Sequence, residues 1–249
     1  MLKCIKLLVV ICLITIKTMS LADDIPVYDA ENTLTVGTTA DFMPFEFMRD
    51  GNVVGFDIDL INAIAKDLNM EVLIRDMQFY SLIPSLQNGD IKVAIAGMSH
   101  TPERARQIDF STPYYFNTFA MLVIGEHDTV DPIKPGMKIG VQTGTLMHQW
   151  IKKQKIGIDI VTMDSNIQLV EDLKSKRLDG ILFDSVLAKS VINANPYLDL
   201  NLINLQEVSD DGMSIGVKKD SPLLEKINSS IAKLVESGEI AKLKEKWGL

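Results

Sequence analysis

The feature that most constrains the fold is a regular alternation of short apolar runs with longer amphipathic segments. Apolar residues recur at three-four spacing in these segments, as in Leu60, Ile61, Ile64 and Leu68, which is the periodicity of a helix with one buried face. Strands alternating with helices are typical of an α/β fold. Strands are predicted at 34–38, 71–74, 93–96, 138–141, 160–161, 180–183 and 213–217, and helices at 57–68, 82–86, 146–153, 167–173, 186–192 and 223–235, with a last helix reaching Trp247.

The first 22 residues have the pattern of a secretory signal peptide. Lys3 and Lys6 precede an apolar run at 7–16, and Ser20-Leu21-Ala22 forms a small-residue cleavage site. The run has about ten residues, fewer than the roughly twenty that span a bilayer. We therefore predict a signal peptide at 1–22 and export of the remaining chain to the periplasm, in preference to an uncleaved anchor.

Composition excludes several classes of function. Both cysteines, Cys4 and Cys12, lie in the predicted signal peptide, so the exported chain has no thiol for a disulfide or a thiolate metal site. The formal net charge is −8, and the acidic residues are spread along the chain. This charge argues against nucleic acid or an anionic membrane surface as a partner.

A candidate binding segment follows the apolar run at 91–96. The run ends at Gly97, where a backbone can approach a ligand closely, and Ser99 supplies a hydroxyl. Thr101 and Pro102 predict a helix N-cap and first helical residue, which places Arg104 on a short helix beyond a strand end. Its guanidinium can bind a carboxylate with two hydrogen bonds. The alternative is an exposed arginine on a surface helix.

A second polar cluster follows the later strands. Gln142, Thr145 and Leu146 lie where a strand ends and a helix begins, and the free amides of a helix N-terminus can bind an anion. Thr145 is equally suited to be the cap of that helix. Asp184 ends the apolar run at 181–183 and is a candidate for binding an ammonium group. Its alternative role is the N-cap of the helix at 186–192.

Four blocks of sequence carry a resemblance to a known family: GTTADFMPFEF at 37–47, VGFDIDL at 54–60, LIPSLQNGDIKVAIAGMSHTPER at 82–104 and GVQTGT at 140–145. The ending KEKW at 244–247 agrees with it. Taken in order behind a predicted signal peptide, these blocks resemble the periplasmic polar-amino-acid-binding proteins of ABC transporters. The specific resemblance is to bacterial solute-binding protein family 3, of the arginine- or glutamine-binding type.

The resemblance implies a two-lobe periplasmic-binding-protein fold, also called a Venus flytrap, with two hinge crossovers. Lobe one would be discontinuous in the sequence and lobe two would be inserted into it. The implied boundaries are 23–113 and 213–249 for lobe one, 120–206 for lobe two, and 114–119 and 207–212 for the hinge.

The resemblance also implies roles for residues in the matching blocks. Arg104, with Ser99 and the backbone near Gly97, would bind the α-carboxylate of a free amino acid, and Asp184 would bind its α-ammonium. Phe42 and Phe79 would form walls for the ligand side chain, with Gln142 near its far end and the backbone at Thr145 and Leu146 completing the carboxylate site. Several relatives that bind cationic side chains have Asp or Glu where Thr39 stands, which disfavours lysine but does not eliminate arginine. The further residues Asp41 and Glu46 are acids whose direction the sequence does not fix.

The expected function is binding of an arginine-like or glutamine-like amino acid and its delivery to an inner-membrane ABC permease, by a monomer without a cofactor. Two alternatives remain. One is an enzyme similar to periplasmic cyclohexadienyl dehydratases, and the other is a sensory ligand-binding domain. The sequence has no recognisable catalytic motif, and His100, His127 and His148 lack metal-binding spacing. We therefore predict a binding protein and not an enzyme.

Overall fold

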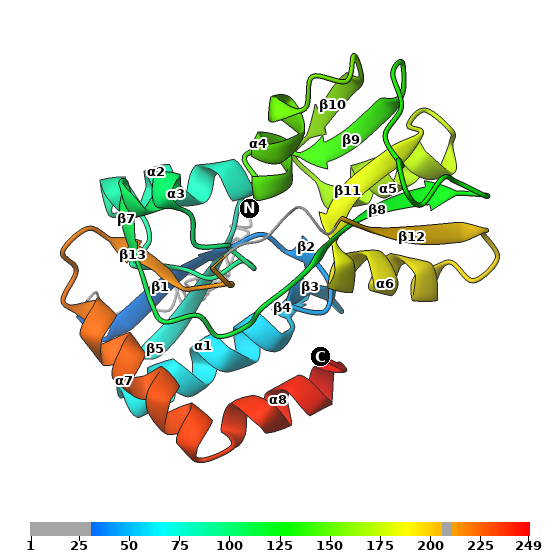
Figure 1. The fold of residues 1–249 in the computed structure, drawn as a ribbon. Coiled ribbons are helices and arrows are strands. Elements are labelled where there is room, and N and C mark those ends of the chain that lie inside the picture. Colours follow the sequence, from blue (N-terminus) through cyan, green and yellow to red (C-terminus); the bar gives the residue numbers. More distant parts are fainter. Residues whose placement is uncertain (1–30, 206–210) are drawn as a thin grey trace, which may run out of the picture.

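The computed structural model describes residues 31–205 and 211–249. The predicted signal peptide at 1–22 and most of the predicted crossover at 207–212 therefore lie outside the described residues. Figure 1 shows two α/β lobes placed side by side, each with its own sheet and helices. This arrangement agrees with the predicted two-lobe α/β fold.

The sheet of lobe one has the strand order β5-β1-β6-β13-β7. Strands β1 (Thr33–Thr38), β5 (Glu71–Asp76) and β6 (Val93–Ala94) are parallel, and β13 (Gly216–Lys218) runs antiparallel to both β6 and β7 (Ile108–Phe110). Strand β13, which lies between β6 and β7 in the sheet, therefore comes from much later in the chain, and this makes lobe one discontinuous in sequence.

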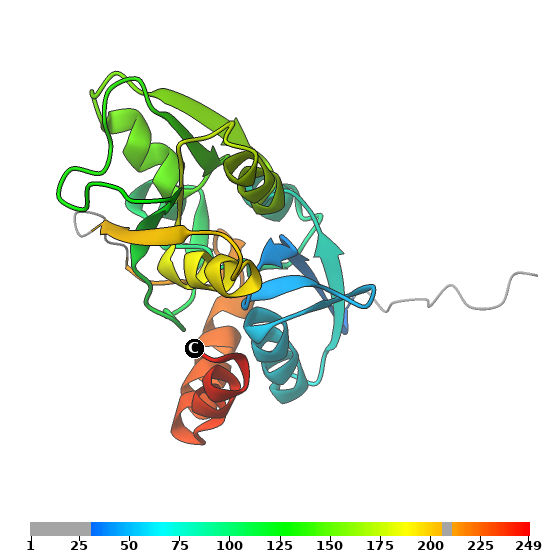
Figure 2. The ribbon, with the colours of Figure 1, turned by 90° about the vertical axis from the view of Figure 1, so that its right-hand side faces the viewer.

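Helices and a small second sheet complete lobe one. The helices are α1 (Phe56–Asp67), α2 (Leu82–Asn88), α3 (Pro102–Ala105), α7 (Leu223–Glu236) and α8 (Glu239–Trp247), with a 3₁₀ turn η1 at Phe79–Ser81. Strands β2 (Asp41–Phe42), β3 (Glu46–Arg49) and β4 (Asn52–Val54) form an antiparallel sheet of their own. Helix α7 lies on the side of lobe one away from lobe two, as Figures 1 and 2 agree.

The sheet of lobe two has the order β10-β9-β11-β8-β12. Strands β10 (Asp159–Met163), β9 (Lys138–Gln142) and β11 (Gly180–Asp184) are parallel, while β8 (Phe119–Ile124) is antiparallel to β11 and to β12 (Leu200–Leu205). The helices are α4 (Leu146–Lys153), α5 (Asn166–Lys174) and α6 (Ser185–Ala194). Parallel strands place their carboxyl ends at one edge, so β9 and β11 deliver Gln142 and Asp184 to the same side.

The chain passes between the lobes twice, after β7 and after β12. The two passages meet at Met213, whose amide donates to the carbonyl of Tyr115 (2.7 Å) and whose carbonyl accepts from the amide of Tyr114 (2.9 Å). An isolated bridge also pairs Met213 with Ser99. The crossing backbone is therefore hydrogen-bonded to the segment that leads to Arg104.

Candidate ligand-binding site

A pocket of about 30 Å³ lies between the two lobes. Every predicted site residue except Thr39 lines it. The lining consists of Phe42, Phe79, Gly97, Ser99 and Arg104 from lobe one, and Phe119, Gln142, Thr145, Leu146, Met147 and Asp184 from lobe two. The folding of the chain thus brings side chains from distant strand ends and helix starts into one small space.

Arg104 is held in the pocket by its own short helix. Thr101 caps α3, its hydroxyl accepting from the backbone amide of Arg104 (3.2 Å), and Pro102 opens the helix as the sequence predicts. The side chain is only 3% exposed, which contradicts the alternative of a solvated surface arginine. Its guanidinium lies 5.2 Å from the centre of the Phe79 ring.

The same guanidinium connects the lobes. Nη1 donates to the carbonyl of Ser99 in lobe one (2.7 Å), and Nη2 donates to the carbonyl of Gly144 in lobe two (3.0 Å). Gly144 has a φ of +80°, and a Cβ added there would lie 3.1 Å from the Cβ of Tyr80. The turn before α4 therefore packs directly on lobe one, and the lobes are closed on each other.

Gly97 permits the close packing behind the pocket. Its φ is +54°, and an added Cβ would lie 2.4 Å from a ring carbon of Phe42. A side chain here would be both strained and in collision with the aromatic wall. Phe42 is in turn stacked on Phe45, with ring centres 5.1 Å apart.

Two buried acids, Asp57 and Glu46, lie behind the segment that contains Gly97. The Oδ2 atom of Asp57 accepts from the Gly97 amide (2.9 Å) and from the Tyr114 hydroxyl (2.8 Å). Glu46 is beside it and both side chains are fully buried. Burial raises the pKa of Asp57 to about 6. Burial, together with the neighbouring Asp57 carboxylate, raises the pKa of Glu46 well above its usual value, so the pair retains a proton more readily than exposed acids do.

Lobe two contributes the start of α4. The Thr145 hydroxyl accepts from the His148 amide (3.2 Å), so Thr145 is the predicted N-cap. Leu146 and Met147 occupy the first turn, whose amides have no partner within the helix. Because both residues line the pocket, the positive end of the α4 dipole lies beside it.

Asp184 lines the pocket from the end of β11. It stands at the N-cap position of α6 but its side chain makes no capping hydrogen bond. Its Oδ1 instead accepts from Nδ2 of Asn117, which lies between β7 and β8. The structure thus disfavours the capping alternative, because the Asp184 side chain makes no capping bond to the helix that it precedes.

Thr39 and Gln142 are held by their own lobes. The Thr39 hydroxyl donates to the carbonyl of Met77 (3.0 Å), and the residue is not part of the pocket lining. Gln142 does line the pocket, and its Nε2 donates to the carbonyl of Asp164 (3.1 Å). Glu46 is buried below the pocket, and Asp41 contacts lobe two elsewhere, so neither acid lines the pocket.

Sequence reasoning missed several residues of this region. Phe119 and Met147 line the pocket, and Asn117 orients Asp184. The sequence places Phe119 and Asn117 only in the expected crossover at 114–119. Met147 directly follows the predicted Leu146, so the helical start at 146 was the signal that could have identified it.

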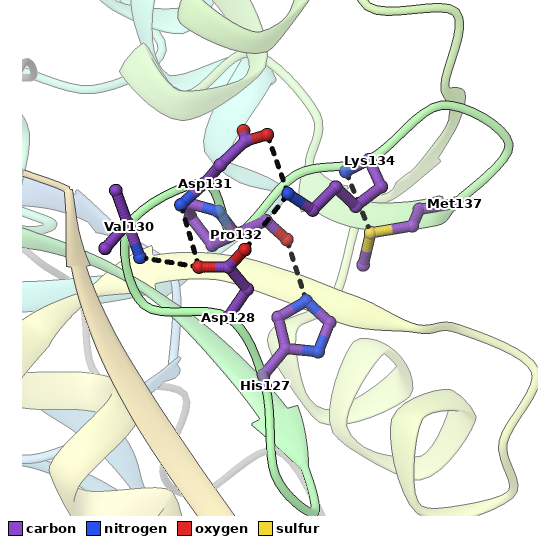
Figure 3. A network of polar contacts seen from close by, with 7 residues as sticks. All are labelled: His127, Asp128, Val130, Asp131, Pro132, Lys134 and Met137. Carbon is purple, nitrogen blue, oxygen red and sulfur yellow. Dashed lines mark hydrogen bonds and ion pairs between the residues drawn. The ribbon is translucent and has the colours of Figure 1, made fainter.

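The three histidines do not form a site. His100 Nδ1 lies 2.9 Å from a carboxylate oxygen of Asp211, and His148 Nδ1 accepts from the Gly144 amide (3.1 Å). His127 contacts the carbonyl of Pro132 (2.7 Å) inside the loop before β9, which Figure 3 shows held by Lys134 and Asp128. Within 31–205 and 211–249, no group of three or more histidine, cysteine, aspartate or glutamate side chains is arranged to hold a metal ion.

Fold and pocket together define a two-lobe protein that can enclose a small charged ligand. Comparison with known proteins agrees: a family model of bacterial extracellular solute-binding proteins, family 3, matches residues 34–249. The chain belongs to this family. None of the helices in the described part of the chain is long and apolar enough to cross a membrane.

Individual relatives are similar over most of their length. The arginine-binding extracellular protein ArtP of Bacillus subtilis is 34% identical over 219 residues, covering 86% of this chain and 85% of that protein. An ancestral arginine-binding protein solved with arginine is 38% identical, with a TM-score of 0.81, over 87% of this chain and 98% of that one. An ancestral arginine-binding protein solved with glutamine is 39% identical, again with a TM-score of 0.81, over 87% and 97%.

Proposed function

We propose that this protein binds a free polar amino acid, arginine or glutamine, outside the cytoplasm and presents it to the permease of an ABC transporter. The observation that carries the proposal is one buried pocket with a cation from lobe one and a carboxylate from lobe two, Arg104 and Asp184. This pair matches the two charges of an amino-acid zwitterion. The relatives described as binding arginine and glutamine support the same ligand class.

In this proposal the ligand carboxylate binds the Arg104 guanidinium, in the position that the Gly144 carbonyl takes in the closed structure. The first-turn amides of α4 face the same group from lobe two. Asp184 binds the ligand ammonium, and Asn117 holds the carboxylate of Asp184 in place. Phe42 and Phe79 contact the ligand side chain.

Entry of the ligand requires the lobes to separate. A space of about 30 Å³ holds about two water molecules, and an amino acid is several times larger. Opening breaks the contacts of Arg104 with Gly144 and of Gly144 with Tyr80. A ligand that touches both lobes then favours the closed state through contacts that the open state lacks.

A screen of the twenty amino acids by thermal unfolding and calorimetry tests the proposal. A ligand at one hundred times its Kd stabilises the protein by about 2.7 kcal/mol, and small-angle scattering should then show a smaller radius of gyration. Cyclic hydroxy-acids of the dehydratase type, assayed for turnover, serve as the comparison. Binding by none of the twenty, or turnover of a hydroxy-acid, would contradict the proposal.

Permease delivery and the export signal rest on family membership and on the sequence at 1–22. Release of a cleaved chain beginning at Asp23 into the periplasmic fraction, detected by N-terminal sequencing, tests the second point. The chain is proposed to act as a monomer, so scattering should give the mass of a single chain with and without ligand.

A further inference from the structure

The lobes are joined by a polar contact that lies outside the ligand pocket. Asp41, in the β2–β3 hairpin of lobe one, accepts two hydrogen bonds from Asn166 at the start of α5 in lobe two. Oδ2 accepts from the Asn166 amide (2.7 Å) and Oδ1 accepts from its Nδ2 (3.0 Å). Asn166 is only 4% exposed and Asp41 is half-buried, so the contact is partly shielded from water.

The contact suits the chemistry of both partners. The first turn of α5 contains no acid of its own, and a carboxylate is favoured beside the exposed amides and positive dipole of a helix N-terminus. Asp41 supplies that carboxylate from the other lobe. Its two oxygens meet two donors of one residue, which fixes the relative position of the hairpin and the helix.

The contact forms only between closed lobes, and neither partner lines the ligand pocket. Its free energy therefore adds to the closed state whatever ligand is bound. We propose that Asp41 acts as a latch that sets ligand affinity. It binds the start of α5 when the lobes close, and it strengthens the binding of every ligand without contacting the ligand itself. This inference rests on the proposed function for its ligands but not for its geometry.

The size of the effect follows from two opposing contributions. Hydrogen bonds to a charged group stabilise more than neutral ones, whereas closing the lobes removes the Asp41 carboxylate from water. Burial raises the pKa of Asp41, and the bonds from Asn166 lower it. The cost of removing the carboxylate from water therefore offsets part of the free energy gained from the two hydrogen bonds. We expect the latch to change ligand affinity by about 10-fold.

The first test is calorimetry of arginine and glutamine binding to Asp41→Asn. The variant keeps the shape of the side chain but removes the carboxylate charge, so its hydrogen bonds with Asn166 are neutral and weaker. Both ligands should bind about 10-fold more weakly, with their affinity ratio unchanged and their dissociation faster. Asp90→Asn removes the same charge from an exposed residue of lobe one and should leave both affinities at the wild-type value.

The second test exchanges the partners. Asn166→Asp places two carboxylates together and should weaken binding further than Asp41→Asn. In the double variant Asp41→Asn, Asn166→Asp, the new Asn accepts from the backbone amide and donates to the new Asp, so affinity should return to within a few-fold of wild type. Such recovery identifies a pairwise interaction and not loss of folding.

Three results would overturn the latch. One is an Asp41→Asn affinity within twofold of wild type, and another is failure of the exchanged pair to recover. The third is a loss confined to cationic ligands, which would mean that Asp41 reaches the ligand side chain.

If the wild type binds no amino acid, the proposed function fails but the latch can still be tested. Spin labels at Lys66→Cys and Lys155→Cys, on exposed residues of the two lobes, report the interlobe distance in the free protein. The latch predicts a smaller closed fraction in Asp41→Asn than in wild type, and an equal fraction overturns it.

Discussion

At the scale of single residues, the site depends on buried charges that are placed by short local motifs. Thr101 and Pro102 fix the start of α3 and thereby the direction of Arg104. Asp184 stands at a helix start yet does not cap it, because Asn117 holds its carboxylate toward the pocket. A residue type at a cap position is therefore not sufficient evidence of capping.

Arg104→Ala should abolish useful binding of any amino acid. The change removes the hydrogen bond to Ser99 within lobe one and the bond to Gly144 in lobe two, and it leaves the ligand carboxylate without its guanidinium partner. We expect a loss of about 2–5 kcal/mol, or roughly thirty- to several thousand-fold in affinity. Calorimetry of the folded variant checks it. Arg106→Ala, an exposed arginine two residues away, is the control, and equal affinities for the two variants would exclude Arg104 from the site.

Asp184→Asn should weaken ligands that carry an α-ammonium by about tenfold or more, since a buried charge loses its counter-ion. Because the carboxylate makes no capping bond, the melting temperature of the free protein should change little. Binding and unfolding are measured on the same preparation. Asp164→Asn, an exposed acid of lobe two, controls for net charge. Unchanged binding with a lower melting temperature would instead assign Asp184 a structural role.

At the scale of elements, the sequence predicts the parts whose signals are local. The helix predicted at 146–153 matches α4 (Leu146–Lys153), and Thr145 is its cap as expected. Strand β8 was missed because Phe119–Ile124 is a continuous apolar run, almost all of it buried. Such a run has no periodicity that separates a strand from a helix. The two-to-four-residue strands β2, β3 and β4 are too short to give any periodicity.

Glu46→Gln tests whether the buried acid pair Glu46 and Asp57 retains a proton in the folded protein. The pKa values of Glu46 and Asp57 are raised in the folded state, so the folded protein binds more protons than the unfolded chain. The pair's contribution to stability is therefore complete below pH about 4 and is lost as pH rises through the raised pKa values, which for Asp57 is about 6. Gln imitates the protonated acid, so the variant should gain about 1–3 kcal/mol over wild type at pH 8.

Denaturant unfolding between pH 4 and pH 8 measures this gain, which should shrink toward zero at the acidic end. Glu236→Gln, at an exposed position near the end of α7, is the matched control for loss of one carboxylate. A gain for Glu46→Gln that does not change with pH would mean that the pair does not retain its proton.

At the scale of the whole molecule, the contacts between the lobes are the part of the structure that the sequence does not predict. Arg104 and Gly144 are 40 residues apart and Asp41 and Asn166 are 125 apart, and no local pattern links either pair. The predicted residues other than Thr39 line one pocket because most of them lie near a strand end or a helix start. The closure contacts, and the position of Thr39 outside the pocket, depend on how two separately folded lobes meet.

The same closure argues for weak binding of lysine. Thr39, whose neutral side chain argues against lysine in the sequence, does not line the pocket, but the lining argues against lysine independently. Among the described residues that line the pocket, Asp184 is the one acid. Once Asp184 holds the α-ammonium, the side-chain ammonium of lysine has no counter-ion, and burying it unpaired is costly. A guanidinium is more weakly hydrated and can stack on Phe42, and an amide carries no charge.

Lysine should therefore bind at least tenfold more weakly than arginine or glutamine in competition titrations, with arginine the tighter of the two. Lysine as the tightest ligand would show that a further acid reaches the pocket when the lobes close on it.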